Sequence, residues 1–382
     1  MDPRALLAST QSKTPWLVEH MRKLVEIESP SEDPAAVNRV MELAADFAVA
    51  LGGKVKRHRQ KSFGDVFELR FGGQRSRQRP VLLLGHLDTV WEHGTLVSMP
   101  WRETEGRIYG PGTLDMKAGV AMALAAISVL REHSLLRPVT LLLNSDEEIG
   151  SPVSRPITEK LARESSAVFV LEPAQMMADG TAALKTARKG IGNYRVEVTG
   201  VASHSGVDFE RGHSAVLELA RQIERISAFT DLKSGLTVNC GVVAGGTRSN
   251  VVAAEAHTEV DVRIARSADA KKVARLFSSL RPFDKACKLT VSGGINRPPM
   301  ERKSGTITLF KQAKRLAADM GFAIEEAATG GGSDGNFTAA LGVPTLDGMG
   351  AVGAGAHAAH EHIVVEHLAP RTALLAAMLA AD

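Results

Sequence analysis

A chain of 382 residues is longer than one hydrophobic core usually supports, so the sequence predicts two domains. The formal net charge of +3 and the aromatic content of 4% give no indication of a nucleic-acid partner or of an acidic membrane surface. The two cysteines, Cys240 and Cys287, form neither a zinc or redox motif nor a disulfide framework, which favours a reduced, cytoplasmic location.

The first half of the chain is predicted to form an open sheet with helices. Residues 1–31 are typical of an amphipathic helix rather than a signal peptide, and no continuous apolar run reaches the roughly 18 residues of a membrane span. Three apolar runs predict buried strands at 80–85, 138–144 and 167–172, and helical spacing predicts a helix over 117–134. Such strands, separated by helices, indicate an α/β fold with a mostly parallel sheet covered on both faces.

The middle of the chain changes character. Apolar and polar residues alternate over 193–200 and 255–266, which predicts strands with one solvated face, and helical patterns cover 214–229 and 269–280. These elements predict an inserted α+β domain of about a hundred residues, which is within the common domain size. The last part returns to the pattern of the first, with a helix at 305–321, a glycine-rich loop at 329–337 and one more strand within 342–350.

Polar residues follow each strand predicted in the first half. His86 and Asp88 follow the first strand, the acids Asp146 to Glu148 follow the second, and Glu172 ends the third. A further acid, Asp115, precedes the long helix. Each of these residues taken alone also fits a solvated turn or a helix N-cap. Together they lie at one edge of a parallel sheet, where ligands bind, and a cation would relieve the repulsion among the carboxylates.

Nitrogen and oxygen ligands without thiolates favour zinc, with cobalt or manganese as substitutes. The segment "GAHAAHEHIVVEH" at 355–367 is either a solvated His-rich tract or the source of a second imidazole. One of its histidines would complete a set of five ligands with His86, Asp115, Glu148 and Glu172. If one carboxylate bridges, each of two ions has the roughly three protein ligands of a catalytic zinc.

Nine short motifs then occur in the order of a known family, namely "GHLDTV", "GPGTLDMKAG", "DEEIGS", "LEPA", "HSG", "GGTRSNVV", "DVR", "GGGSD" and "GAHAAHE". From about residue 15 to the C-terminus the chain resembles the di-zinc family of aminoacylases, succinyl-diaminopimelate desuccinylases and glutamate carboxypeptidases, and it is most similar to the last branch. The resemblance implies a catalytic zinc-hydrolase domain over 1–188 and 299–382. It also implies a lid or dimerisation domain over 189–298, and a homodimer formed through that domain.

The resemblance implies a ligand set for two zinc ions per chain. His86 and Glu172 would bind one ion, Glu148 and His357 would bind the other, and Asp115 would bridge them. His357 is chosen among the late histidines because it precedes Glu361 by four residues, as the family's late histidine does.

The resemblance also implies the catalytic roles. A metal-bridging hydroxide would attack an amide carbonyl, with Glu147 as general base. Asp88 would hydrogen-bond His86, and His204 of the "HSG" motif would stabilise the oxyanion, within its own subunit or across the dimer.

The expected substrate is a small peptide or N-acyl amino acid with a free α-carboxylate. Arg263 suits that carboxylate, and Asn250, Arg297 and the backbone of residues 330–332, including Gly331 and Gly332, would add contacts. A glutamate-reading lysine after "LEPA" has only Lys185 as a loose candidate, so a deacylase or dipeptidase is the alternative to a glutamate carboxypeptidase. A non-catalytic module that uses the glycine-rich loop as a phosphate cradle is the remote alternative, because the loop lacks the Lys-Ser/Thr pair of a P-loop.

Overall fold

The computed structural model describes residues 2–72, 78–134 and 136–381. It divides into two compact units. The first comprises Met1–Ala187, Arg302–Thr329 and Ser333–Asp382, and the second comprises Arg188–Glu301 and Gly330–Gly332. The second unit therefore extends beyond the predicted insert at 189–298. It also includes three glycine-loop residues expected in the catalytic domain, because arginines of the second unit donate hydrogen bonds to their carbonyl oxygens.

A six-stranded sheet organises the first unit. Its strand order is β1-β2-β6-β3-β7-β15. The strands are β1 (Lys54–His58), β2 (Val66–Phe71), β6 (Val139–Asn144), β3 (Val81–His86), β7 (Ala167–Val170) and β15 (Thr345–Leu346). β6, β3, β7 and β15 are parallel, as predicted, whereas β2 and β1 add an antiparallel edge. Four of the five residues of β1 are exposed, so this strand lacked the apolar run that reveals a buried strand.

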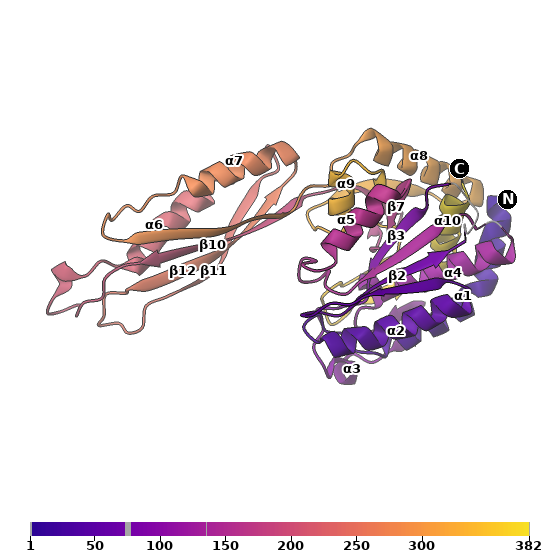
Figure 1. Cartoon of the computed structure of the whole chain (residues 1–382), viewed down its shortest axis with the longest axis horizontal. Coiled ribbons are helices and arrows are strands. Elements are labelled where there is room, and N and C mark those ends of the chain that lie inside the picture. The colour runs from indigo at the N-terminus through magenta and orange to yellow at the C-terminus, as the bar shows by residue number, and fades with distance from the viewer. Residues whose placement is uncertain (1, 73–77, 135, 382) are drawn as a thin grey trace. The chain divides into compact units, whose positions relative to one another are not determined.

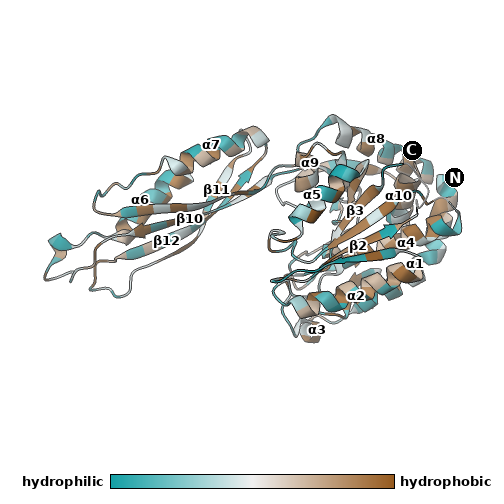
Figure 2. Ribbon diagram, in the orientation of Figure 1, coloured by the Kyte–Doolittle hydropathy of each residue, from teal (hydrophilic) through white to brown (hydrophobic). Residues whose placement is uncertain are grey.

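Helices cover both faces of this sheet (Figure 1). Alternate residues explain the two layers: Leu83 and Leu141 pack into the larger core, whereas Leu82 and Leu142 pack into a smaller core that includes Leu161 of α5. The helices are α1 (Pro3–Val25), α2 (Pro34–Ala50), α3 (Thr95–Ser98), α4 (Ala118–Glu132), α5 (Arg155–Glu164), α8 (Ser304–Met320), α9 (Gly335–Ala340) and α10 (Leu368–Ala380). Hydropathy colouring marks the central strands and the inner helices as predominantly hydrophobic (Figure 2).

Two small sheets complete the first unit. One has the order β16-β17-β5-β4 and the other β14-β9-β8. Their strands are β16 (Gly353–Ala354), β17 (His362–Val364), β5 (Arg107–Tyr109), β4 (Arg102–Thr104), β14 (Ile324–Thr329), β9 (Ala182–Arg188) and β8 (Gln175–Met176). Pairing of β17 with β5 joins the His-rich tract to the segment that leads into Asp115.

The segment Thr113–Glu132 is the one stretch of helix among the described residues long and apolar enough to cross a membrane. Of its most apolar window, 94% is buried inside the structure, so core packing accounts for its composition. The segment contains no unbroken apolar run of that length, because polar residues such as Asp115, Lys117 and Ser128 interrupt it.

The second unit is an antiparallel sheet with the order β11-β12-β10-β13 and two helices. Its elements are β10 (Gly190–Thr199), α6 (Ala215–Ser227), β11 (Thr237–Gly245), β12 (Glu255–Ile264), α7 (Ser267–Ser278) and β13 (Lys288–Arg297). On β10, Tyr194, Val196 and Val198 are buried while Glu197 and Thr199 are exposed. This alternation gives the sheet one covered and one solvated face, as the sequence pattern predicts.

Candidate metal centre

The ends of three parallel strands place most of the predicted ligands. His86 is the last residue of β3, Glu147 and Glu148 follow β6, and Glu172 lies two residues beyond β7. The carboxyl ends of parallel strands share one edge of a sheet, so these side chains meet there. Asp115 comes from the π-helical turn Thr113–Lys117 that precedes α4, and its own backbone is extended, with φ −115° and ψ 90°. His357 lies between β16 and β17 and has a positive φ of 61°.

The carboxylate of Asp115 lies between two histidines. Its Oδ1 is 3.3 Å from His86 Nε2, and its Oδ2 is 3.4 Å from His357 Nε2. A glutamate accompanies each histidine. Glu172 Oε1 is 3.7 Å from His86 Nε2, and Glu148 Oε2 is 3.2 Å from His357 Nε2. The five predicted ligands therefore form two histidine-carboxylate sets that share Asp115.

These separations suit zinc. Zinc bonds of about 2.0–2.1 Å in a tetrahedral site place neighbouring ligand atoms about 3.3–3.4 Å apart. His86 Nε2, Asp115 Oδ1 and Glu148 Oε1 are buried and have no hydrogen-bond partner among the described residues, although buried polar atoms are normally paired. Within the part of the chain that the structure describes, two groups of side chains have ligand atoms close enough for one ion, His86 with Asp115 and Glu148, and His86 with Glu147 and Glu172. The donor set and its spacing fit a metal centre.

The electrostatics of the cluster favour a positive charge. The carboxylates of Asp115 and Glu148 raise the pKa of His357 to about 10. Burial raises the pKa of the Glu148 carboxyl, whereas the two histidines, acting against burial, hold the pKa of Asp115 below its usual range. Carboxylates crowded into a buried site thus require a cation, which protons on the histidines supply when no metal is present.

Asp88 contacts His86 and the two glutamates. The closest acceptor for His86 Nδ1 is the backbone oxygen of Asp88 at 3.0 Å, and the carboxylate Oδ1 is 3.4 Å away. The carboxylate instead accepts hydrogen bonds from the backbone N–H groups of Glu147 and Glu148, each at 3.2 Å, and from Ser31 Oγ at 2.8 Å. Asp88 therefore orients His86 through its main chain and the two glutamates through its side chain.

A buried polar network lies behind the two glutamates. Asp334 of the "GGGSD" motif accepts hydrogen bonds from Asn144 Nδ2 at 2.6 Å and from the Ser151 hydroxyl. Asp146 accepts a hydrogen bond from the backbone of Val153 at 2.6 Å. The motif was expected to act through its glycine backbone, but its acidic residue also holds the loop that carries Glu147.

Two glycines enclose the backbone that leads to Glu172. A Cβ atom on Gly119 of α4, or on Gly350, would lie 2.1 Å from the carbonyl oxygen of Leu171. No side chain fits at either position without moving that carbonyl. The glycines of the "DMKAG" and "DGMG" stretches therefore allow both segments to approach the Leu171 carbonyl closely. This packing fixes the backbone that precedes Glu172.

The predicted residues His204 and Asn250 lie together in the second unit. His204 forms an isolated bridge with Val251, and the backbone oxygen of Asn250 accepts a hydrogen bond from Ser205 N at 3.0 Å. Both residues are exposed. The Nδ1 atom of His204 accepts a hydrogen bond from Gly206 N at 3.2 Å, so a neutral imidazole there carries its proton on Nε2.

The remaining predicted residues surround the glycine segment 330–332. Arg263 is paired with Asp261 of its own strand, with Nε 2.9 Å from Oδ1, and its Nη1 lies 3.4 Å from the oxygen of Gly330. Arg297 is buried, and its Cδ would lie 3.2 Å from a Cβ on Gly332. Arg188, which the sequence analysis did not single out, donates to the oxygens of Gly331 and Gly332 at 3.3 and 3.1 Å. Because Arg297 is buried, it packs against this loop instead of presenting an open cationic surface.

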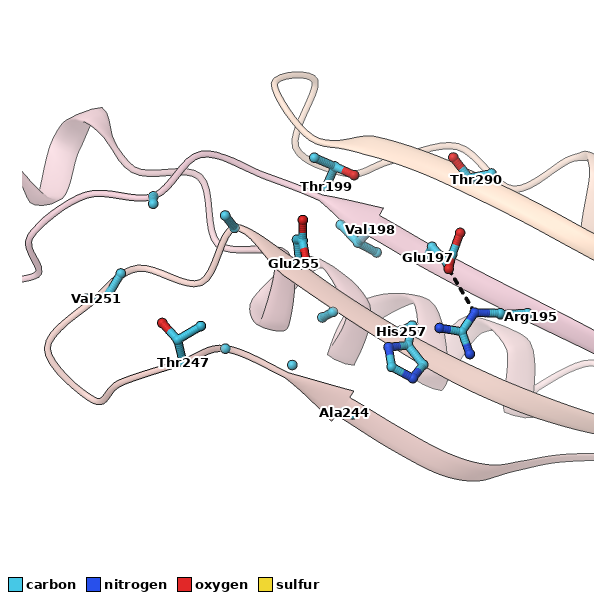
Figure 3. Close-up of a pocket in the computed structure, with 15 residues that line it drawn as sticks. Arg195, Glu197, Val198, Thr199, Ala244, Thr247, Val251, Glu255, His257 and Thr290 are labelled. Carbon is cyan, nitrogen blue, oxygen red and sulfur yellow. Dashed lines mark hydrogen bonds and ion pairs between the residues drawn. The ribbon is translucent and has the colours of Figure 1, made fainter.

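A groove of about 710 Å³ opens on the solvated face of the second unit's sheet (Figure 3). Arg195, Glu197 and His257 are among its lining residues, and none of the predicted site residues is. Arg195 is already paired with Glu197 at 2.8 Å and with Glu259 at 3.1 Å. Because Arg195 and Glu197 pair with one another, the groove indicates no particular chemistry.

Comparison with known proteins agrees with this geometry. Residues 82–381 match peptidase family M20/M25/M40. Carboxypeptidase G2 of Pseudomonas sp. (strain RS-16) is 29% identical over 99% of this chain and 91% of that protein. Acetylornithine deacetylase of Myxococcus xanthus is 28% identical over 55% of this chain and 56% of its own length. The crystal structure of aminopeptidase PepT from Bacillus cereus has the same fold, with a TM-score of 0.76 at 21% identity over 96% of this chain and 98% of that one. The match over most of its length shows that the chain belongs to peptidase family M20/M25/M40 and is a metallopeptidase-type hydrolase.

Proposed function

We propose that the chain is a di-zinc carboxypeptidase that releases a C-terminal amino acid from a small peptide or an N-acyl amino acid. The observation that carries this proposal is the position of Asp115, whose two carboxylate oxygens face two different histidines. His86 and Glu172 would hold one zinc ion, and His357 and Glu148 would hold the other. Cobalt or manganese would substitute, because the ligands are nitrogen and oxygen atoms.

The bound ions would supply a water molecule of lowered pKa and would polarise the amide carbonyl. Glu147 is the proposed general base, which takes the proton of the attacking water and delivers it to the leaving amine. Its backbone N–H is held by the carboxylate of Asp88, and its ligand atom groups with those of His86 and Glu172. A hydrogen-bonded main chain supports a fixed side-chain position, which proton transfer requires.

His204 is the proposed donor to the oxyanion. With Nδ1 accepting from Gly206 N, the neutral ring carries its proton on Nε2, and this N–H would donate to a substrate oxygen. Asn250 and Arg263 are the proposed contacts of the substrate carboxylate. Arg263 would share its guanidinium between that carboxylate and Asp261, and Gly331 and Gly332 would contribute backbone groups.

The preferred substrate is the finer part of the proposal. The similarity to carboxypeptidase G2 spans nearly the whole chain and favours release of a C-terminal amino acid such as glutamate. The similarity to an acetylornithine deacetylase supports an N-acyl amino acid as the alternative.

A panel of folate-like conjugates, N-acyl amino acids and dipeptides tests this choice. The proposal predicts the highest kcat/KM for substrates with a free C-terminal α-carboxylate next to the scissile amide. Equal hydrolysis of the corresponding α-amides would contradict it, because no carboxylate would then be recognised.

We also propose a cytoplasmic homodimer formed through the second unit. β11 is an edge strand, and its Val242 and Val243 are 51% and 55% exposed. Exposed edge strands with apolar side chains favour pairing with another chain. In sedimentation, Val243→Glu should lower the dimer fraction. The control is Val97→Glu, since Val97 is 89% exposed in the first unit and should leave assembly unchanged.

A further inference from the structure

Glu361 is a buried carboxylate that the mechanism above does not use. It is fully buried, and it follows His357 by four residues. Its Oε1 accepts hydrogen bonds from the backbone N–H groups of Leu114 at 2.8 Å and Asp115 at 3.0 Å. Its Oε2 accepts from Gly112 N at 2.9 Å and from Trp91 Nε1 at 2.9 Å. A carboxylate has about four acceptor sites, so all of them are used.

These hydrogen bonds join two segments that are far apart in the sequence. Glu361 is 246 residues from Asp115 and 247 residues from Leu114. The turn that donates these backbone hydrogen bonds carries Asp115, and the segment that supplies the accepting carboxylate carries His357. That segment is itself compact, since Ala358 N donates to Gly355 O and Glu361 N donates to Ala358 O, each at 2.8 Å. A carboxylate that binds several backbone N–H groups fixes their orientation strongly, because each hydrogen bond is charge-assisted.

We propose that Glu361 is a positioning residue that sets the distance between Asp115 and His357, and with it the spacing of the two metal positions. It touches neither substrate nor metal. The expected effect on metal affinity rests on the proposed function, whereas the hydrogen bonds of Glu361 do not depend on it.

Glu361→Gln is the decisive substitution. An amide has one acceptor oxygen, and its NH2 group would face two of the four donors. We expect metal affinity, measured by competition with a chromophoric chelator, to fall about 10- to 100-fold, as is usual when a residue that orients metal ligands is lost. In the metal-free protein, the amide hydrogens of Gly112, Leu114 and Asp115 should exchange faster with solvent. Glu361→Asp keeps the carboxylate and should recover part of the affinity.

Glu218 provides a matched control. It is also buried and accepts hydrogen bonds from Gln222 Nε2 at 2.7 Å and from the backbone of Phe283 and Asp284 at 3.0 and 2.9 Å, but it lies in the second unit. Glu218→Gln should lower the free energy of unfolding without changing metal affinity or the exchange of residues 112–115. An equal loss of metal affinity in both variants would mean that Glu361 acts only through general stability.

The outcomes separate this inference from the proposed function. If the wild-type protein binds metal and a folded Glu361→Gln variant binds it as tightly, the positioning role is wrong. If the wild-type protein binds no metal, the proposed function fails, and the exchange of the three amides alone decides whether Glu361 holds the turn. If Glu361→Gln does not fold, Trp91→Phe removes one donor and should weaken metal binding about 2- to 10-fold, the effect of one hydrogen bond. Unchanged binding in that variant would also overturn the inference.

Discussion

Glu147 and Glu148 are neighbours in the chain, but their ligand atoms belong to different groups. Glu148 groups with His86 and Asp115 and lies 3.2 Å from His357, whereas Glu147 groups with His86 and Glu172. The Asp88 carboxylate accepts hydrogen bonds from both of their backbone N–H groups. We propose that Glu148 is a metal ligand and that Glu147 is the general base.

The two substitutions at these positions should have different effects. Glu147→Gln should keep two metal ions and lose about 10²- to 10⁴-fold in kcat, the usual contribution of a general base. Glu148→Gln should instead lower the metal content, because it removes a ligand charge. Metal analysis and steady-state kinetics of both variants are the measurements. Near-normal turnover by Glu147→Gln would show that another group accepts the proton.

The sequence predicts the metal-ligand candidates better than the residues that orient them. His86, Asp115 and Glu172 were found because they follow strands or precede a helix, and strand ends are visible as apolar runs. Glu361 and Arg188 were not, because their partners are backbone groups far away in the sequence. The contact of the Asp88 carboxylate with His86 was predicted, but the closer contact of the Asp88 main-chain oxygen was not, since the sequence does not reveal main-chain acceptors.

At the scale of elements, α4 approaches the end of β7 at Gly119, and Gly350 approaches the same carbonyl of Leu171. Gly119→Ala would place a methyl group against that oxygen and should lower the free energy of unfolding by about 1–3 kcal/mol, as overpacking does. It should also weaken metal binding, because Glu172 follows the displaced carbonyl. Gly294→Ala is the control, since a Cβ there meets nothing within 4 Å. Chemical denaturation that finds both variants equally stable would contradict the close approach.

Helices α1 and α2 meet at His20. Its ring stacks on Trp16 with centroids 3.7 Å apart and meets Phe47 at 4.4 Å, and burial lowers the pKa of His20 below its usual 6.5. In the unfolded chain His20 gains its proton near pH 6.5, but in the folded chain it does so only at lower pH. The unfolded chain therefore binds this proton more readily than the folded chain. The stability associated with neutral His20 is complete above pH 6.5 and is lost as the pH falls below it. The wild-type protein should therefore lose more stability between pH 7.5 and 5.5 than His20→Phe. Equal losses in thermal or denaturant unfolding would show that His20 titrates normally.

At the scale of the whole molecule, apolar runs and helical spacing predict both the sheet with helices on its two faces and the smaller α+β unit. They did not predict β1, β2, β9, β11, β13 and β14, nor the short strands β4, β5, β8, β16 and β17, whose two or three residues carry no readable period. The assignment of Gly330–Gly332 to the second unit also escaped prediction, since it depends on contacts from Arg188 and Arg263 and not on the order of the chain.

A mixing experiment tests whether His204 acts on the metal centre of its own chain or on that of the partner in the proposed dimer. Chains with His204→Ala can be mixed with chains with Glu147→Gln, each nearly inactive alone. If His204 acts across the interface, one site of a mixed dimer has both lesions and the other has neither, so activity should partly return. No recovery in verified mixed dimers would restrict His204 to its own chain.

The central claim is that two metal ions held by five side chains perform the hydrolysis. The most direct measurement follows metal content and amide hydrolysis together while zinc is removed by a chelator and then added back. We predict about two zinc ions per chain in the active protein, loss of hydrolysis on removal, and full recovery as the second equivalent of zinc binds. A metal-free protein that retains full activity would contradict this account.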